Sequence, residues 1–315
     1  MRIDGQVLDP EAQLLLRLLR ISRRPAYETL PVADAREETR REAAAVAGTP
    51  LAVGRVEETA VAGPDRDLAA RLYVPLDAPV RGPLLVYLHG GGWVVGDLDT
   101  HDQTCRFIAN EAGVRVLAID YRRAPEHPFP AAVEDAVAGV RSAIDQGERL
   151  GADPARVAIG GDSAGGNLAA AAARLTRGDG VPPAFQLLIY PVTDLSRKRR
   201  SYELFREGFY LTESTMDWYR DNYLPDPGAA LDPRASPVLA GALDGLPPAH
   251  VAVAGFDVLR DEGEEYASRL RDAGVPVTLQ RHSGLIHGFA NAIGVGRSSR
   301  AAMLEVAAAL RAGLA

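Results

Sequence analysis

The sequence contains one cysteine, Cys105, and therefore cannot form an internal disulfide. Cys105 stands in an apparently helical segment beside Phe107 and Ile108, with no basic pair or activating histidine motif around it. A nucleophilic thiol needs such an electropositive setting. We therefore expect Cys105 to be a packed side chain.

Long apolar runs are also missing. No segment reaches the length needed to span a membrane. The leucine-rich stretch 14–19 is interrupted by Arg17 and preceded by acidic residues, whereas a secretory signal has an uninterrupted apolar region after a basic start. We therefore expect a cytoplasmic protein without stable membrane association.

Positive charge is in deficit, and the formal net charge is −7. This balance argues against nucleic acid or an anionic membrane as a partner. The short basic run 197–200 is interpreted as a solvated linker, because the sequence around it is acidic. The 315 residues are long enough for a sizeable core.

Hydrophobic periodicity predicts a mainly parallel sheet with helices on both faces, because strand and helix patterns alternate from residue 84 onward. An antiparallel hairpin, 53–61 with 68–74, precedes this part. The predicted later strands are 83–88, 114–119, 157–159, 185–190, 250–254 and 275–280. The predicted helices are 33–47, 102–111, 131–150, 263–273 and 298–312, after a first one that starts at Asp9-Pro10.

The predicted elements suggest three parts. Residues 1–50 form N-terminal cap helices, although a loosely attached arm is the alternative. Residues 51–194 and 249–315 form an α/β core. Residues 195–248, rich in aromatics and prolines but without a buried strand, form a helical cap insertion at the carboxyl edge of the sheet, where ligands of such sheets bind.

The segment Gly161-Asp162-Ser163-Ala164-Gly165 follows a buried strand and precedes an alanine-rich helix. This is the G-x-S-x-G pattern in the strand–turn–helix context that it requires. Such a turn holds the serine hydroxyl out above the sheet, while glycines on either side let strand and helix approach. Ser163 is therefore the candidate nucleophile.

A serine hydroxyl needs a base to take its proton and an acid to orient that base. In this fold the acid and then the histidine follow the serine along the chain. This order sets aside His89, His101 and His127, and His250 looks like a residue entering a strand. His287, in a loop after the last strand, is the candidate base, and His282 is the alternative.

The acid is expected in the loop after the strand at 250–254. Asp257 comes first in this loop and is the candidate. Asp261 and Glu262 lie about one helical turn further on, where we expect them to cap the next helix or face solvent.

The run His89-Gly90-Gly91-Gly92 after the first buried strand suits an oxyanion hole. Glycines let successive backbone amides point to one place, where they can meet the negative charge of a tetrahedral intermediate. We assign Gly91 and Gly92, with the amide of Ala164 as third donor. A phosphate-binding loop is disfavoured, because the Lys-Ser/Thr ending of a P-loop and the G-x-G-x-x-G spacing are missing.

Together these segments resemble the hormone-sensitive-lipase-like (bacterial family IV) carboxylesterases of the α/β-hydrolase superfamily, and the resemblance spans nearly the whole chain. The matching segments are 89–93, 120–132, 161–167, 257–263 and 287–289. The resemblance implies the triad Ser163, Asp257 and His287, the oxyanion donors Gly91, Gly92 and Ala164, and a cap made from the N-terminal helices and the insertion. Val258 and Arg123 stand where the family usually has proline and leucine, which puts local packing in doubt.

We therefore expect an α/β-hydrolase fold with a helical cap and a serine carboxylesterase that acts on short- to medium-chain acyl esters, without metal or cofactor. A non-catalytic small-molecule receptor on the same scaffold is one alternative, although the resembling gibberellin receptors typically lack the catalytic histidine. Amidase or lactonase activity by the same triad is another. A homodimer through the last strand is possible if that strand lies at a sheet edge.

Overall fold

The computed structural model describes residues 1–315. Its main sheet consists of β3 (Arg55–Ala62), β4 (Asp67–Val74), β5 (Gly82–Leu88), β6 (Arg115–Ile119), β7 (Ala152–Asp162), β8 (Phe185–Ile189), β9 (Ala249–Phe256) and β10 (Val277–Ile286). The spatial order is β10-β9-β8-β7-β5-β6-β4-β3. The pairs β3–β4 and β4–β6 are antiparallel and all the others are parallel, as the sequence predicted.

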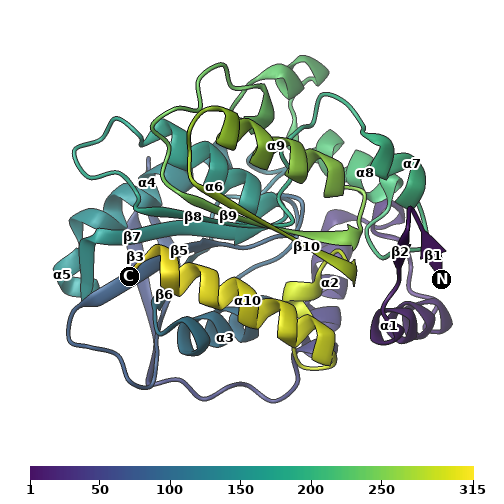
Figure 1. Cartoon of the computed structure of the whole chain (residues 1–315), viewed down its shortest axis with the longest axis horizontal. Helices are drawn as coiled ribbons and strands as arrows, with labels where there is room; N and C mark the ends of the chain where they lie inside the picture. Colours follow the sequence, from purple (N-terminus) through teal and green to yellow (C-terminus); the bar gives the residue numbers. More distant parts are fainter.

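Helices cover both faces of this sheet (Figure 1). On one face lie α4 (Ala131–Asp145), α6 (Ala164–Leu175) and α9 (Arg260–Asp272), and on the other lie α3 (Asp102–Ala112) and α10 (Arg297–Gly313). The central strand β5 is completely buried, and its side chains alternate between the two apolar cores: Leu84, Val86 and Leu88 enter one, Leu85 and Tyr87 the other. Each such leucine contributes about 1.5–3 kcal/mol through burial.

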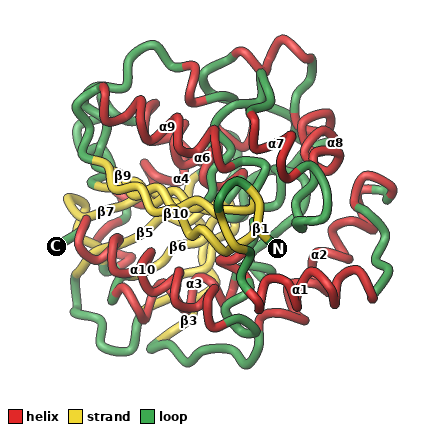
Figure 2. Tube along the Cα trace, turned by 45° about the vertical axis from the view of Figure 1, so that its right-hand side comes forward, coloured by secondary structure: helices red, strands yellow, loops and turns green.

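The N-terminal segment packs at the carboxyl end of the strands (Figure 2). It contains α1 (Pro10–Ile21), the short 3₁₀ turn η1 (Tyr27–Thr29) and α2 (Val32–Ala47), close to the predicted bounds. The side chain of Asp9 caps α1 by accepting hydrogen bonds from the amides of Glu11 and Ala12. Arg36 of α2 donates a hydrogen bond to the carbonyl of Val94 at 2.8 Å, which docks this helix on the core.

A small hairpin of β1 (Arg2–Ile3) and β2 (Gln6–Val7) precedes α1 and was not predicted. It lies beside the end of β10, where the amide of Asp9 donates to the carbonyl of Gly284 at 2.9 Å. Strands of two residues are too short to produce a detectable alternation of polar and apolar residues, so sequence periodicity does not predict them.

The insertion 195–248 is helical and contains no strand, as predicted. Its elements are α7 (Arg200–Phe205), α8 (Glu213–Tyr223) and the 3₁₀ turns η2 (Pro227–Leu231) and η3 (Pro237–Leu239). Aromatic rings attach it to the core: Tyr223 stacks on Trp93 with ring centroids 4.2 Å apart, and Phe205 and Phe209 pack against Phe256.

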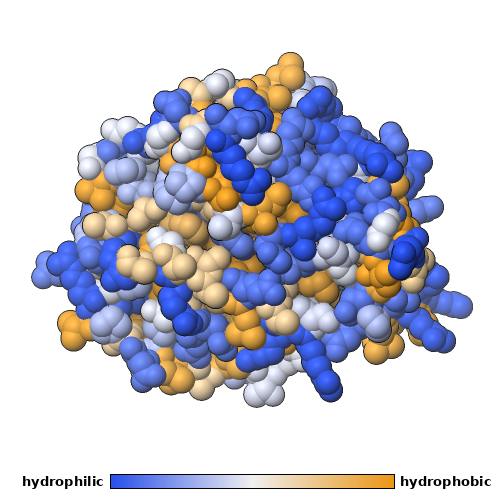
Figure 3. All heavy atoms as spheres, in the orientation of Figure 1, coloured by the Kyte–Doolittle hydropathy of each residue, from blue (hydrophilic) through white to orange (hydrophobic).

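The basic run 197–200 is solvated only in part, which corrects the interpretation made from the sequence: Arg197 and Arg200 are exposed, but the two residues between them are paired. Arg199 is only 10% exposed and pairs with the fully buried carboxylate of Asp194 at 2.6 Å, and also with Glu265 on α9. Lys198 pairs with two acidic residues of α8. The surface over α7, α8 and α9 is accordingly hydrophilic (Figure 3), and its charges hold the insertion against the core.

Other predicted boundaries also need correction. The helix predicted at 131–150 is two helices, since α4 ends at Asp145 and α5 (Gly147–Leu150) follows a break at Gln146. The last strand, predicted at 275–280, continues to Ile286. Residues of this edge strand alternate between exposed and partly buried, so the strand has no continuous apolar run from which its end could be predicted. His282 therefore lies within the strand and not after it, as the sequence had suggested.

No helix combines the length and apolar character that crossing a membrane requires. The expected cytoplasmic location and the pairing of β10 with a second copy stay predictions, although β10 does lie at the sheet edge.

Candidate active site

Ser163 occupies the sharp corner between β7 and α6, with φ 55° and ψ −119°. A positive φ is strained for a residue with a side chain and persists only where the surroundings enforce it. Two glycines make the corner possible, because a Cβ on Gly161 or Gly165 would lie 2.2 or 1.9 Å from the carbonyl oxygen of Leu88. The sequence pattern therefore reflects a physical requirement for close approach.

The structure brings Ser163, His287 and Asp257 together from three separate segments. Nε2 of His287 lies 3.0 Å from Oγ of Ser163, and Nδ1 of His287 lies 2.7 Å from Oδ2 of Asp257. Ser163 is 8% exposed, His287 7% and Asp257 1%. The carboxylate requires a proton on Nδ1, which leaves the lone pair of Nε2 directed at the serine hydroxyl.

Neighbouring groups fix this geometry. The other oxygen of Asp257, Oδ1, accepts a hydrogen bond from the amide of Leu259 at 3.0 Å. The ring of Tyr190 lies against the imidazole of His287 with centroids 4.4 Å apart. Both side chains are therefore held in single orientations before any substrate arrives.

The alternative residues weighed in the sequence lie elsewhere. His282 packs against Phe289 from within β10. Asp261 accepts from the amide of Ser201, and Glu262 accepts from the amides of Thr193 and Asp194. Glu262 is completely buried, so the expectation that it caps a helix or faces solvent is wrong.

The glycine loop adopts conformations that need glycine. Gly91 and Gly92 have φ values of +117° and +57°, and a Cβ on Gly92 would collide with the ring of Tyr219. The amide nitrogens of Gly91 and Gly92 have no hydrogen-bond acceptor within the chain. Both residues line the same small cavity as Ser163. The loop therefore offers two free donors beside the serine.

A second imidazole–carboxylate pair lies behind this loop, and sequence reasoning missed it. Asp162 is 2% exposed and accepts hydrogen bonds from the hydroxyl of Tyr87 at 2.7 Å and the amide of Gly90 at 2.9 Å, while Nε2 of His101 lies 3.3 Å away. Burial on its own would raise the pKa of Asp162, but His101 and these hydrogen bonds outweigh burial and hold the pKa at about 2.

No hydrogen bond joins His101 to Ser163, so His101 does not replace His287 as the partner of the hydroxyl. Chain order set His101 aside as a base, which the geometry supports, but the same rule hid its contact with Asp162. The available signal was the acidic residue directly before the serine. A carboxylate buried at that position needs a partner.

His89 has a structural place in the loop. Its ring stacks on Tyr121 with centroids 4.3 Å apart, and Nδ1 donates to the carbonyl of Gly90 at 2.8 Å. Burial, followed by the nearby His101, lowers the pKa of His89 to about 3, so the ring is neutral near pH 7. A neutral ring can donate through Nδ1 without adding charge beside the site.

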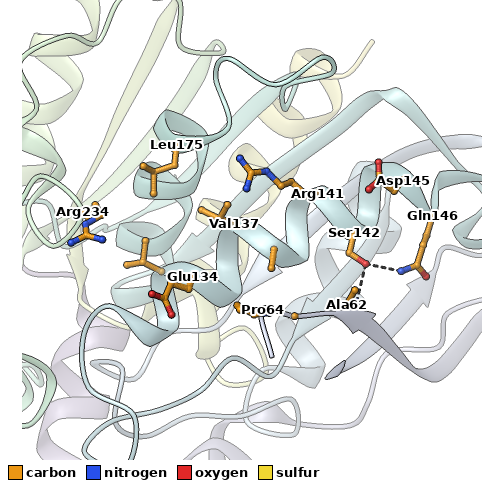
Figure 4. Close-up of a pocket in the computed structure, with 13 residues that line it drawn as sticks. Ala62, Pro64, Glu134, Val137, Arg141, Ser142, Asp145, Gln146, Leu175 and Arg234 are labelled. Atoms are coloured by element: carbon orange, nitrogen blue, oxygen red, sulfur yellow. Dashed lines mark hydrogen bonds between the residues drawn. The ribbon is translucent and has the colours of Figure 1, made fainter. Parts of the chain in front are cut away.

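Ser163 opens into a cavity of about 110 Å³ under α8. A larger hollow, of about 660 Å³, lies between the β3–β4 turn and α4 (Figure 4). Several of its polar groups are already paired: Ser142 bonds to Ala62 and Gln146, and Arg141 bonds to Asp179. Nothing there points to a ligand.

No group of three or more His, Cys, Asp or Glu side chains is arranged to hold a metal ion. Cys105 is buried in α3 among the apolar side chains of one core, which agrees with its expected packing role.

Comparison with known proteins places these features in a family. Residues 85–291 match a family described as the alpha/beta hydrolase fold. The chain is 46% identical to the carboxylic ester hydrolase LipN of Mycobacterium tuberculosis over 99% of this chain and 85% of that protein. It is 37% identical to an ethyl acetate hydrolase of Pseudomonas putida, covering 90% of this chain and 92% of the relative.

Solved structures agree with this result. The fold superposes with a TM-score of 0.94 on a variant of an alpha/beta hydrolase enzyme from the metagenome of Lake Arreo, Spain. The two chains are 43% identical, and the match covers 97% of this chain and 98% of the other.

Proposed function

The chain belongs to the α/β-hydrolase family, in its hormone-sensitive-lipase-like branch, and we propose that it hydrolyses carboxylic esters with Ser163 as nucleophile, His287 as general base and acid, and Asp257 as the group that orients the imidazole. The protein is a carboxylesterase. The observation that carries the proposed mechanism is the continuous contact from Asp257 through His287 to Ser163, at 2.7 and 3.0 Å.

In the first half of the reaction, Oγ of Ser163 attacks the ester carbonyl carbon while Nε2 of His287 takes the hydroxyl proton. The negative charge that develops on the carbonyl oxygen meets the amides of Gly91, Gly92 and Ala164. Such preorganised donors stabilise the intermediate more than the ground state. The C–O bond to the alcohol then breaks as His287 returns the proton to the leaving oxygen.

In the second half, water takes the place of the alcohol. His287 accepts a proton from water, whose oxygen attacks the acyl carbon bound to Ser163. The carboxylic acid leaves as the proton returns to the serine oxygen. Asp257 stays ionised throughout and stabilises the imidazolium formed in each half.

Short to medium acyl chains fit this site better than long ones. The cavity at Ser163 measures about 110 Å³. The aromatic side chains of Tyr27, Tyr210 and Tyr219 close it on the side of the cap. A long chain would have to displace these rings.

The direct test is steady-state hydrolysis of 4-nitrophenyl acetate by the wild type and by Ser163→Ala and His287→Ala. Loss of either group should lower kcat by about 10⁴-fold or more, with the thermal midpoint of unfolding little changed. His282→Ala is the matched control, because it removes the alternative histidine. Full activity of Ser163→Ala, or ester binding by the wild type without turnover, would contradict the proposal.

A further inference from the structure

Three separate cavities meet at Tyr210. The first is the reaction cavity, lined by Ser163 and Gly92. The second, of about 320 Å³, lies between α1, α2 and the segment after β10, and we name it the helix cavity. The third, of about 280 Å³, lies beside η1. Tyr210 lines all three.

We propose that the helix cavity receives the leaving alcohol, that Tyr210 separates it from the acyl side, and that the preferred substrates are esters of a short acid with a bulky apolar alcohol. This inference rests on the proposed ester hydrolysis at Ser163.

The direction of the alcohol follows from the proton transfers. His287 returns a proton to the leaving oxygen, so the alcohol departs on the imidazole side of the tetrahedral carbon. His287 and Gly288 line both cavities, whereas Leu285 lines only the helix cavity. Neither Ser163 nor any glycine-loop residue borders the helix cavity, which therefore lies only on the imidazole side of the serine. The oxyanion amides border the reaction cavity instead. The carbonyl oxygen and the acyl chain therefore belong to the reaction cavity and the alcohol to the helix cavity.

The volumes of the two cavities support the same assignment of the acyl group and the alcohol. A water molecule in the liquid takes about 30 Å³, so the reaction cavity has room for roughly four non-hydrogen atoms and the helix cavity for roughly eleven. Acetyl to butyryl groups suit the first. A cyclic or aromatic alcohol suits the second.

The lining of the helix cavity favours an apolar group. Its walls include Leu15, Leu19, Val46 and Val295. The three acidic side chains at its wall already have partners within the chain: Oδ2 of Asp9 accepts from Ser298, Oε2 of Glu11 accepts from the amide of Ser298, and Glu42 accepts from Tyr27 at 2.6 Å. These carboxylates are therefore already occupied and favour an apolar alcohol over one that needs hydrogen bonds from the wall.

Tyr210 is held in place as a partition by its backbone and by a close contact. Its φ is +76°, which is strained for a tyrosine. The ring lies over Gly288, where an added Cβ would be 3.0 Å from Cε1 of Tyr210. Gly288 directly follows the catalytic imidazole, so this contact places the ring at the boundary between the two sides of the ester.

The test uses two substrate series. In the acetate series the alcohol changes from ethanol through cyclohexanol to 1-naphthol, and in the 4-nitrophenyl series the acid changes from acetate through butyrate to octanoate. Leu15→Trp fills the helix cavity, and Leu14→Trp places the same ring on the exposed face of the same helix. We expect Leu15→Trp to lower kcat/KM for cyclohexyl and 1-naphthyl acetate at least about tenfold while ethyl acetate changes little, and Leu14→Trp to change none.

Tyr210→Ala joins the three cavities and should raise kcat/KM for the octanoate relative to the acetate by about tenfold, whereas Tyr210→Phe keeps the ring and the wild-type ratio. The proposal is overturned if Leu15→Trp lowers octanoate hydrolysis instead of hydrolysis of the bulky acetates, or if neither series responds to either variant. Absence of turnover by the wild type on every ester would instead remove the proposed function itself.

Discussion

The carboxylate of Asp162 lies directly behind the glycine loop and accepts a hydrogen bond from the amide of Gly90 at 2.9 Å. The next residue in the chain is Ser163, the proposed nucleophile, so this hydrogen bond links the serine corner to the glycine loop. Nε2 of His101 lies 3.3 Å from the same carboxylate. Asp162 therefore acts as a positioning residue for the loop.

Removing this carboxylate should affect the transition state more than substrate binding. We expect Asp162→Ala to lower kcat about 10–100-fold with KM changed less than about threefold, because the Gly91 and Gly92 amides lose their alignment and one oxyanion donor is worth 10²–10³ in kcat. Asp162→Asn keeps an acceptor oxygen for Gly90 and should recover part of kcat. Equal losses in the two variants, or a loss confined to KM, would contradict the positioning role.

The close approach of strand and helix at the serine predicts a strong effect of a single methyl group. Gly165→Ala would place Cβ 1.9 Å from the carbonyl oxygen of Leu88, so the backbone must shift. We expect a loss of about 3 kcal/mol or more in the free energy of unfolding. Gly178→Ala is the matched control, since nothing lies within 4 Å of its Cβ. Urea denaturation measures both, and equal stability of the two variants would be inconsistent with the crowded corner.

The basic run at 197–200 provides a test of buried against exposed ion pairs. Arg199 faces the buried carboxylate of Asp194, whereas Arg197 is 62% exposed. Arg199→Ala should cost about 3 kcal/mol of unfolding free energy, because it leaves a buried charge without its main partner. Arg197→Ala should change the free energy of unfolding by less than about 1 kcal/mol. A larger effect at Arg197 than at Arg199 would refute this reading.

Acid should destabilise the protein in part through His250. Burial, followed by the nearby His282, lowers the pKa of His250 to about 4 from an ordinary value of 6.5. The unfolded chain therefore binds a proton between these values that the folded chain does not, and stability present above pH 6.5 is lost as the pH falls toward 4. From pH 7 to pH 5 this amounts to about 2 kcal/mol.

The variant His250→Asn isolates this contribution. Relative to the wild type, the free energy of unfolding of this variant should rise by about 2 kcal/mol when the pH falls from 7 to 5. His127→Asn, at an exposed position, should show no such shift. A stability difference at His250 that is independent of pH would show that folding does not lower the pKa of this ring.

The parts of the fold that sequence predicted are those with strong local signals. The continuous apolar run of β5 and the capped start of α1 at Asp9 both encode their structure locally. The end of β10 could not be predicted in the same way, because alternating exposure at a sheet edge leaves no apolar run around His282. The two-residue strands β1 and β2 depend on tertiary contact with the end of β10.

The same distinction between local signals and tertiary contacts applies to the residues of the candidate site. Ser163 and His287 belong to segments whose chemistry is readable from residue type and order, and the structure brings them within 3.0 Å. The pairing of His101 with Asp162 depends on how α3 meets the end of β7, a relationship between segments 61 residues apart. No local pattern encodes such a distance.

The central claim is that Ser163 is the nucleophile, and covalent labelling tests it most directly. The chain is treated with a 4-nitrophenyl alkylphosphonate, digested with trypsin and analysed by mass spectrometry. Ser163 is the only hydroxyl-bearing residue in the tryptic peptide 157–174, so the mass of this peptide alone locates the label. We predict one phosphonate on this peptide, with loss of activity in proportion to labelling. Complete inactivation with peptide 157–174 unmodified would contradict the account.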